Sequence, residues 1–560
     1  MIFFGFAVLF GAVVLGVVVA LSRRGDDRSG GGDAHGVRRF FQYLLLYALL
    51  LIVANGLAGL LGWALGGPDS LALRFETSLA RNLSFVLIGL PLYAALGWWS
   101  LGKLRSDPRE RQSFGWLFYS TAATTTALVV AMTHLHDVVA GLAEGERWYG
   151  SPLVSFVVWG GLWVVHWLVI RRLAHRIVEL PLLVGSAIGL LTAAVGLAQF
   201  LSGAIEMVAV RNLLLGDGPG LGEDGATLLV GAAAWIPNWW AARTVTRSPL
   251  WLGYVFVLGV GGGLATVLTA AGAVLQSLLV WWVGDPRTTD AARHFSDVPE
   301  QLSAAIVGGI VWWYHRALVA GPATERTEPK RIYEYLMAGI GLLAAAGGLT
   351  ALLVAFFEAV TGSPTIVEGT SAINTLLRAA TFLLIGAPVW WFFWRRIARE
   401  KPEAEIASPT RRIYLFTILG LSSVAAVVAL ITAVFILFED LLAGTVGADT
   451  LRSLRIAVAS LITTGVLAAY HWAVYRGDRR LAPTAPERPR FVLLIGPADD
   501  EITKAVRDLT KARVQLWRRA DTVPPWSVDA VVAALAGVSA DEVVVVAGPD
   551  GPQVIEVERD

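Results

Sequence analysis

Long uninterrupted runs of apolar residues dominate the sequence, and short polar stretches separate them. A transmembrane helix needs about 20 mostly apolar residues, and each of these runs is long enough to cross a bilayer. The first run extends from Ile2 to Leu21, and the others lie at 38–63, 81–102, 114–140, 152–170, 180–210, 225–242, 250–283, 301–318, 333–360, 373–394, 413–442 and 455–475. The pattern therefore predicts an all-α polytopic membrane protein with thirteen transmembrane helices.

The first apolar run has the flanks of a membrane anchor. A secretory signal needs basic residues before its apolar run and a small-residue cleavage site after it. Here nothing basic precedes the run, and Arg23 and Arg24 follow it. We therefore predict an uncleaved anchor at 1–22 with its N-terminus outside the cell, and a flexible Gly-rich linker at 23–36. The alternative is a cleaved signal peptide.

Basic and acidic residues lie in alternate loops. One set of loops carries most of the lysine and arginine, for example Arg38, Lys103, Arg171, Arg243 and Arg316. The other set is acidic, with Glu144, Glu146, Asp217, Glu223, Asp285 and Asp290. Because basic loops stay in the cytoplasm, the C-terminal end of the chain is predicted to be cytoplasmic. The Ala, Gly, Arg and Trp usage suggests a bacterial plasma membrane.

The composition agrees with a membrane protein and excludes several functions. The chain is 55% hydrophobic and only 16% charged, whereas soluble domains carry about 25% charged residues. The net charge of +1 provides no basic field for nucleic acid. There is no cysteine, which excludes disulfides and thiolate sites. We find no phosphate loop, nucleophile elbow, zinc-protease helix or dinucleotide fingerprint, so neither a catalytic residue nor a cofactor is predicted.

The apolar runs repeat as pairs that form helical hairpins. Proline occupies one position in the first, third and fifth hairpins: Pro91, Pro237 and Pro388. Histidine occupies another in the second, fourth and sixth: His166, His315 and His471. Both recur about every 150 residues, a period that indicates tandem repeats. We predict three parallel four-helix units at 37–175, 176–325 and 326–476, related by an axis along the membrane normal.

Three basic and aromatic openings carry a family resemblance: VRRFFQY at Val37, KRIYEYL at Lys330 and TRRIYLF at Thr410. Each precedes a hairpin whose second helix holds a WW or HW pair. These features resemble the uncharacterised bacterial membrane-domain family DUF5671 over 36–475, most closely in the first, fifth and sixth hairpins. The resemblance implies a membrane location and no reaction.

The chain ends in a segment with a different pattern. A Pro- and Arg-rich linker at 477–490 precedes a short apolar run from Phe491, which is typical of a buried strand. Amphipathic and apolar segments then alternate, and a Pro-Asp-Gly turn at 549–551 joins the last two predicted strands. We predict a small cytoplasmic β-α-β-α-β-β domain at 491–560, which offers a site for a cytoplasmic protein partner. Nothing in the sequence specifies an oligomeric state.

Tryptophan gathers near the basic ends of the predicted helices. The indole ring prefers the headgroup level of a bilayer, so these residues predict an interfacial belt against lipid, with a ligand-stacking site as the alternative. The belt comprises Trp98, Trp99, Trp163, Trp167, Trp239, Trp240, Trp312, Trp313, Trp390, Trp391, Trp394 and Trp472.

The repeated histidines are the sharpest candidate site. If the three units surround an axis, His166, His315 and His471 could converge and bind zinc, or titrate as a gate. The simpler interpretation is that each ring bonds a backbone carbonyl or reaches the headgroups and recurs because the unit was duplicated. His134 and Asp137 in the HLHD segment share a helix face and form a second, weaker metal candidate.

Charged residues near the outer helix ends are candidates for ion pairs. Glu358 and Glu439 end first helices of hairpins, and Arg378 and Arg455 begin second helices. These residues could pair across the outer interface, because a helix of about 26 residues places Glu358 at the membrane edge. No acidic or basic residue lies clearly at mid-membrane, which argues against a proton relay.

Two functional classes follow from this pattern. The first is a non-catalytic membrane scaffold or sensor with a cytoplasmic interaction domain. The second is a transporter or channel with a path between the units. Continuous helices with dry packing favour the first, and helices broken at Pro91, Pro237 and Pro388 favour the second.

Overall fold

The computed structural model describes residues 33–66, 75–111, 113–145, 150–172, 179–209, 220–244, 248–319, 327–360, 371–400, 405–406, 408–481, 489–497, 500–510, 512–521, 526–536, 538, 540–548 and 551–557. The predicted anchor at 1–22 lies outside these described residues. The chain divides into two units, one of 1–397 with 421–466 and one of 398–420 with 467–560.

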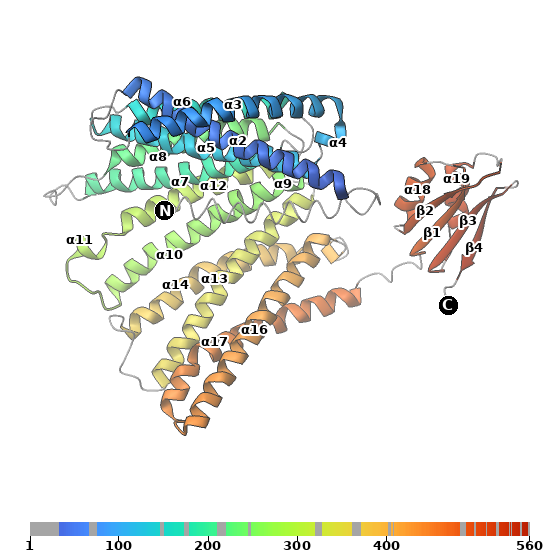
Figure 1. Ribbon diagram of the computed structural model, residues 1–560. Helices are drawn as coiled ribbons and strands as arrows, with labels where there is room; N and C mark the ends of the chain where they lie inside the picture. The colour runs from blue at the N-terminus through green and yellow to red at the C-terminus, as the bar shows by residue number, and fades with distance from the viewer. Residues whose placement is uncertain are drawn as a thin grey trace. The chain divides into compact units, whose positions relative to one another are not determined.

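Helices form most of the described chain up to residue 481 (Figure 1). The longer ones are α2 (Asp33–Gly66), α3 (Phe75–Ser106), α5 (Phe114–Ala143), α6 (Gly150–Arg172), α7 (Glu179–Ala209), α8 (Leu221–Ala242), α10 (Gly263–Trp282), α12 (Val298–Val319), α13 (Glu328–Val360), α14 (Ala372–Ala398), α16 (Pro409–Ala443) and α17 (Ala448–Leu481). Three short helices, α4 (Pro108–Arg111), α9 (Pro249–Gly253) and α11 (Ala291–His294), lie between them.

Within the described residues, 11 helices are long and apolar enough to cross a membrane. This number agrees with a multi-pass membrane protein. The predicted crossing at 225–242 is the exception, because helix α8, which contains Pro237 and Asn238, is not among the 11. Helix α8 instead packs along α7, and a Cβ atom at Gly189 of α7 would lie only 2.4 Å from the backbone nitrogen of Trp235.

Proline residues do not interrupt the helices. Pro91, Pro237 and Pro388 lie inside α3, α8 and α14, respectively, and each of these helices continues past its proline. The irregular segment lies elsewhere. Between α9 and α10 the chain forms a π-helix, η3 (Tyr254–Gly262), so that Pro249–Trp282 is helical throughout. π-Helical turns are rare and occur frequently at functional sites, and no sequence pattern predicted this one.

Small residues allow several helix pairs to approach closely. A Cβ atom at Gly263 of α10 would lie 2.7 Å from the backbone nitrogen of Trp312 on α12. The small-residue spacing of Gly259 and Gly263 therefore serves close helix packing. Aromatic residues fill the wider spaces, as in the cluster that Tyr43, Trp116 and Tyr119 form between α2 and α5.

The C-terminal region has the predicted order of strands and helices: β1 (Phe491–Gly496), α18 (Asp500–Thr510), β2 (Arg513–Arg518), α19 (Val528–Leu535), β3 (Glu542–Gly548) and β4 (Gly551–Val557). The sheet order is β2-β1-β3-β4. Strand β1 is parallel to both β2 and β3, and β3 pairs antiparallel with β4. Gly551, the first residue of β4, has φ +118°, a value that favours glycine.

Candidate functional site

The first repeated histidine forms a hydrogen-bonded chain with two tyrosines. His166 on α6 bonds the carbonyl oxygen of Leu162 through Nδ1 at 2.8 Å and the hydroxyl of Tyr119 on α5 through Nε2 at 2.9 Å. Because a carbonyl can only accept, Nδ1 of the neutral ring carries the hydrogen and Nε2 accepts from Tyr119. The hydroxyl of Tyr93 lies 3.0 Å from that of Tyr119 and must donate to it. The hydrogen bonds therefore run in one direction, from Tyr93 to Tyr119 and from Tyr119 to His166.

The other two histidines have the same local geometry. Nδ1 of His315 bonds the carbonyl of Val311, and Nδ1 of His471 bonds that of Leu467, each at 2.8 Å. A tyrosine ring faces each imidazole, with ring centres 5.7 Å apart for Tyr119–His166, 5.8 Å for Tyr254–His315 and 5.9 Å for Tyr414–His471. The recurring feature is thus a tyrosine–histidine pair between the two helices of a hairpin.

The tyrosine of this pair was missed by the sequence reasoning, although a spacing could have found it. A serine precedes it by six residues and a large side chain by three: Ser113, Trp116 and Tyr119; Ser248, Trp251 and Tyr254; Ser408, Arg411 and Tyr414. In the first two cases the serine hydroxyl caps its helix by accepting from the tryptophan backbone nitrogen. The cap fixes where the helix begins, and the tyrosine then lies on the face toward the histidine.

The middle pair differs in its hydrogen bonds. The hydroxyl of Tyr254 accepts from Ser186 Oγ at 2.9 Å and from Trp235 Nε1 at 3.3 Å. His315 is fully buried, and its Nε2 has no hydrogen-bond partner among the described residues. A Cβ atom at Gly259 would lie 2.2 Å from Cγ of His315, so the ring packs directly on the π-helical backbone.

The predicted metal sites receive no further ligands. Within the described ranges, no group of three or more His, Asp or Glu side chains is placed to hold a metal ion. Nδ1 of His134 lies 3.7 Å from Asp137, and Nε2 of His136 lies 3.1 Å from the hydroxyl of Thr227 on α8. The HLHD segment therefore contacts the neighbouring helix rather than a third ligand.

The tryptophans near the basic helix ends divide into two groups. Trp98, Trp99, Trp240, Trp313, Trp391 and Trp472 are exposed on the protein surface, whereas Trp239 and Trp394 are buried and Trp163, Trp167, Trp312 and Trp390 are half-buried. Arg243 stacks on Trp240 with its guanidinium carbon 4.0 Å from the ring centre, and Arg171 lies 4.7 Å from that of Trp167. The exposed rings are suited to lipid headgroups, and the buried ones pack the helix interfaces.

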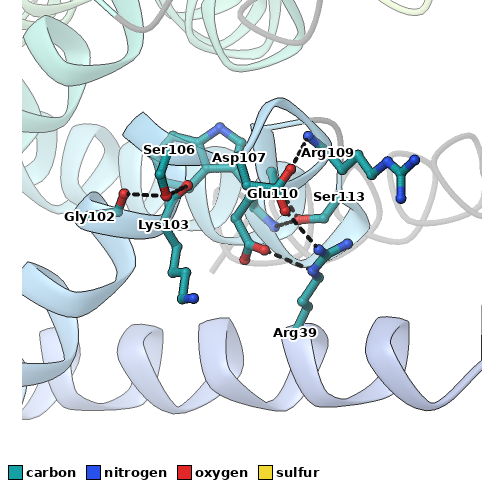
Figure 2. A network of polar contacts seen from close by, with 9 residues as sticks. Arg39, Gly102, Lys103, Ser106, Asp107, Arg109, Glu110 and Ser113 are labelled. Carbon is teal, nitrogen blue, oxygen red and sulfur yellow. Dashed lines mark hydrogen bonds and ion pairs between the residues drawn. The ribbon is translucent and has the colours of Figure 1, made fainter.

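A buried carboxylate joins the first two hairpins (Figure 2). Glu110 on α4 is 3% exposed and lies 2.7 Å from Nε of Arg39 on α2. Asp107 lies 3.2 Å from the same guanidinium and accepts from the backbone nitrogen of Arg109 at 2.8 Å. The hydroxyl of Ser113, which caps α5, donates to the carbonyl of Glu110 at 2.8 Å. The sequence reasoning treated this segment only as a basic loop and missed the network.

Buried carboxylates recur at other helix ends. Glu334 on α13 is 1% exposed and lies 3.0 Å from Arg396 on α14. Glu179 on α7 accepts from the hydroxyl of Ser248, the cap of α9. Ion pairing or hydrogen bonding to a cap offsets the cost of burying each charge.

Among the charged residues near the predicted outer ends, two from different hairpins form an ion pair. Glu358 on α13 lies 3.0 Å from Nε of Arg455 on α17. No ion pair joins Arg378 or Glu439 to another described residue. Both side chains of the Glu358–Arg455 pair are about one-third exposed, so the pair contributes at most about 1 kcal/mol.

Replacing Tyr119 with phenylalanine is expected to destabilise the protein by about 1 to 3 kcal/mol, because Nε2 of buried His166 loses its donor. Tyr93→Phe is the matched control. It removes one hydroxyl but leaves His166 satisfied, so we expect a loss of about 1 kcal/mol. SDS titration of the purified protein in detergent would measure both changes. Equal losses of stability in the two variants would contradict the donor and acceptor roles assigned to Tyr93, Tyr119 and His166.

The comparisons with known proteins identify part of the helical region. The model of the family DUF5671, a domain of unknown function, matches residues 39–147 and 331–466. No curated protein and no solved structure matches the chain significantly. The first match extends over α2 to α5, and the second extends from α13 into α17. Two segments of this chain therefore match the DUF5671 family model, which confirms the resemblance predicted from the basic and aromatic openings.

Proposed function

We propose that this protein is a non-catalytic scaffold or sensor of the bacterial plasma membrane. Three parallel four-helix units at 37–175, 176–325 and 326–476 form its membrane part, with the N-terminus outside. Residues 491–560 form a cytoplasmic interaction domain. The main support for this proposal is that Pro91, Pro237 and Pro388 lie inside continuous helices. A transporter commonly binds its substrate where transmembrane helices are broken.

The tyrosine–histidine pairs support the threefold repeat. The Nδ1 bond to the carbonyl four residues earlier and the facing tyrosine ring recur once in each proposed unit. The two family matches lie in the first and third units, which is the arrangement expected if one unit was duplicated. The middle unit would then be the most diverged copy, in keeping with the different hydrogen bonds of Tyr254.

The use of the buried polar groups supports a scaffold. Glu110 and Glu334 pair with arginines, Glu179 accepts from a helix cap, and the histidines bond backbone carbonyls. These carboxylates and the Nδ1 atoms of the histidines have partners within or between the packed helices, whereas Nε2 of His315 has none among the described residues. A substrate path would instead need polar groups that face a common water-filled space.

Cysteine accessibility can test the scaffold against the transporter, because the chain contains no native cysteine. Thr124 in α5 and Thr463 in α17 are 6% and 2% exposed and lie well inside their helices, and Thr→Cys is a small change at both sites. Lys103→Cys, at the exposed end of α3, is the control.

We expect a membrane-impermeant thiol reagent to modify Lys103→Cys in permeabilised membranes and to leave Thr124→Cys and Thr463→Cys unmodified. Unfolding the protein in SDS should then expose both buried thiols. Modification of either buried position in the folded protein would reveal a water path and favour the transporter.

A further inference from the structure

The two central strands of the C-terminal sheet are apolar on both faces. Strand β1 reads FVLLIG and β3 reads EVVVVAG. A strand with one solvated face alternates apolar and polar residues, whereas a strand covered on both faces is a continuous apolar run. These two sequences are therefore typical of strands that are covered on both sides.

Among the described residues, helices α18 and α19 cover one face of this sheet (Figure 1). Val492 and Leu494 of β1 and Val543 and Val545 of β3 are completely buried under α18 and α19. Both helices contribute to that single core, through Ile502 and Val506 of α18 and Val531 and Leu535 of α19. No helix among the described residues of this region packs on the opposite face.

The opposite face is apolar at its centre. Leu493 and Ile495 of β1 and Val544 and Val546 of β3 are only half-buried. On the outer strands, Trp517 of β2 and Ile555 of β4 are 55% and 48% exposed. We call these six residues the open face. An exposed apolar surface of this kind marks an interaction site.

The size of the open face suits a small protein interface. Four strands about 4.8 Å apart, each of six residues, span about 20 Å by 20 Å. Two such faces in contact bury about 1,000 Å² of accessible surface in total, which is the lower limit for a specific interface. Two sheets that pack face to face are also a stable arrangement in β-sandwiches.

The charges beside the open face complement those of a second copy. In the sheet register, Phe491 of β1 lies opposite both Arg513 of β2 and Glu542 of β3, so the three form one row on this face. When two sheets stack about a two-fold axis along β1, Arg513 of each copy lies over Glu542 of the other. The same axis places both copies of β1 with their first residues at one end of the dimer.

We propose that the open face binds the open face of a second copy of this chain, so that the protein forms a two-fold dimer through its C-terminal sheet. The proposal rests on the interaction role proposed above for 491–560 and names its partner. Two-fold dimers are the commonest closed assemblies, and a single self-complementary surface is sufficient to form one.

Cross-linking of the full chain in native membranes tests the proposal. Leu493→Cys places a thiol near the proposed axis, and Lys504→Cys on the exposed side of α18 is the control. With a short bismaleimide, Leu493→Cys should yield a cross-linked dimer and Lys504→Cys should stay monomeric. Cross-linking of Leu493→Cys to a protein of another mass would overturn the proposed self-association. It would still support the proposal that 491–560 is an interaction domain. Free labelling of Leu493→Cys, equal to that of Lys504→Cys, would overturn both proposals.

Exchanging the charges of Arg513 and Glu542 distinguishes binding to a second copy from binding to any other protein. Arg513→Glu alone or Glu542→Arg alone creates two like-charge contacts in the dimer, so each should reduce cross-linking of Leu493→Cys about tenfold. The double exchange, R513E with E542R, should restore it. A double variant as deficient as the single variants would contradict the proposed stacking, because only a second copy carries the exchanged charges at both positions.

Discussion

Gly231→Ala is expected to lower the free energy of unfolding by about 3 kcal/mol, the upper end of the usual cost of overpacking. Gly231 lies on α8, and a Cβ atom there would be 2.2 Å from the backbone nitrogen of Ala193 on α7. Since the obstructing atoms belong to a helix backbone, no side-chain rotation can relieve the contact. The two helices would have to separate along their length, and Gly189 and Gly196 make equally close contacts in the same interface.

Gly161→Ala on α6 provides the matched control. No heavy atom lies within 4 Å of a Cβ atom built at Gly161. Alanine favours the helix over glycine by up to about 1 kcal/mol, so this variant should be neutral or slightly stabilising. Fluorescence-detected gel filtration after heating would compare the two variants with the parent protein. If Gly231→Ala unfolded at the same temperature as Gly161→Ala, the close α7–α8 packing would be wrong.

The helices were predictable from sequence because the bilayer imposes one strong requirement on them. A long apolar run leaves few alternatives to a helix, and this holds for every predicted crossing in the described residues except the one at α8. There, Pro237, Asn238 and many small residues lower the mean hydropathy of the helix, and close packing through Gly231 holds it against α7. Hydropathy alone does not register such pairwise packing.

The sites were less predictable, because their geometry depends on residues that are distant in sequence. The recurrence of His166, His315 and His471 was visible, but the partner Tyr119 lies 47 residues before His166. In the π-helix, Gly259 packs directly against His315, which is 56 residues further along the chain, and no local pattern encodes that contact. The open face illustrates the same difficulty. Its apolar sequence predicted a buried strand, and only the sheet topology reveals which side lacks a cover.

Removing the carboxylate of Glu110 is expected to have the second large effect. In Glu110→Gln the shape of the side chain is kept, but Arg39 loses its 2.7 Å partner inside the packed junction of α2 and α4. Breaking a buried ion pair costs about 3 to 5 kcal/mol. We expect a loss of about 3 kcal/mol, the lower end of this range, because Asp107 still lies 3.2 Å from the guanidinium and the Arg39 side chain is 20% exposed to water. SDS titration of the purified protein would measure the loss.

Two further variants separate the ion pair from the local hydrogen bonds. Asp107→Asn keeps the oxygen that caps α4, and this residue is 38% exposed, so its loss should be below about 1 kcal/mol. The double variant Arg39→Met with Glu110→Gln also removes the guanidinium that Glu110→Gln leaves without its closer partner. Replacing both members of a buried ion pair often leaves the stability unchanged, so the double variant should be more stable than Glu110→Gln alone. If the two substitutions were simply additive, the charge of Arg39 would not be the cause of the loss in Glu110→Gln, and the ion pair would not be the main interaction of this carboxylate.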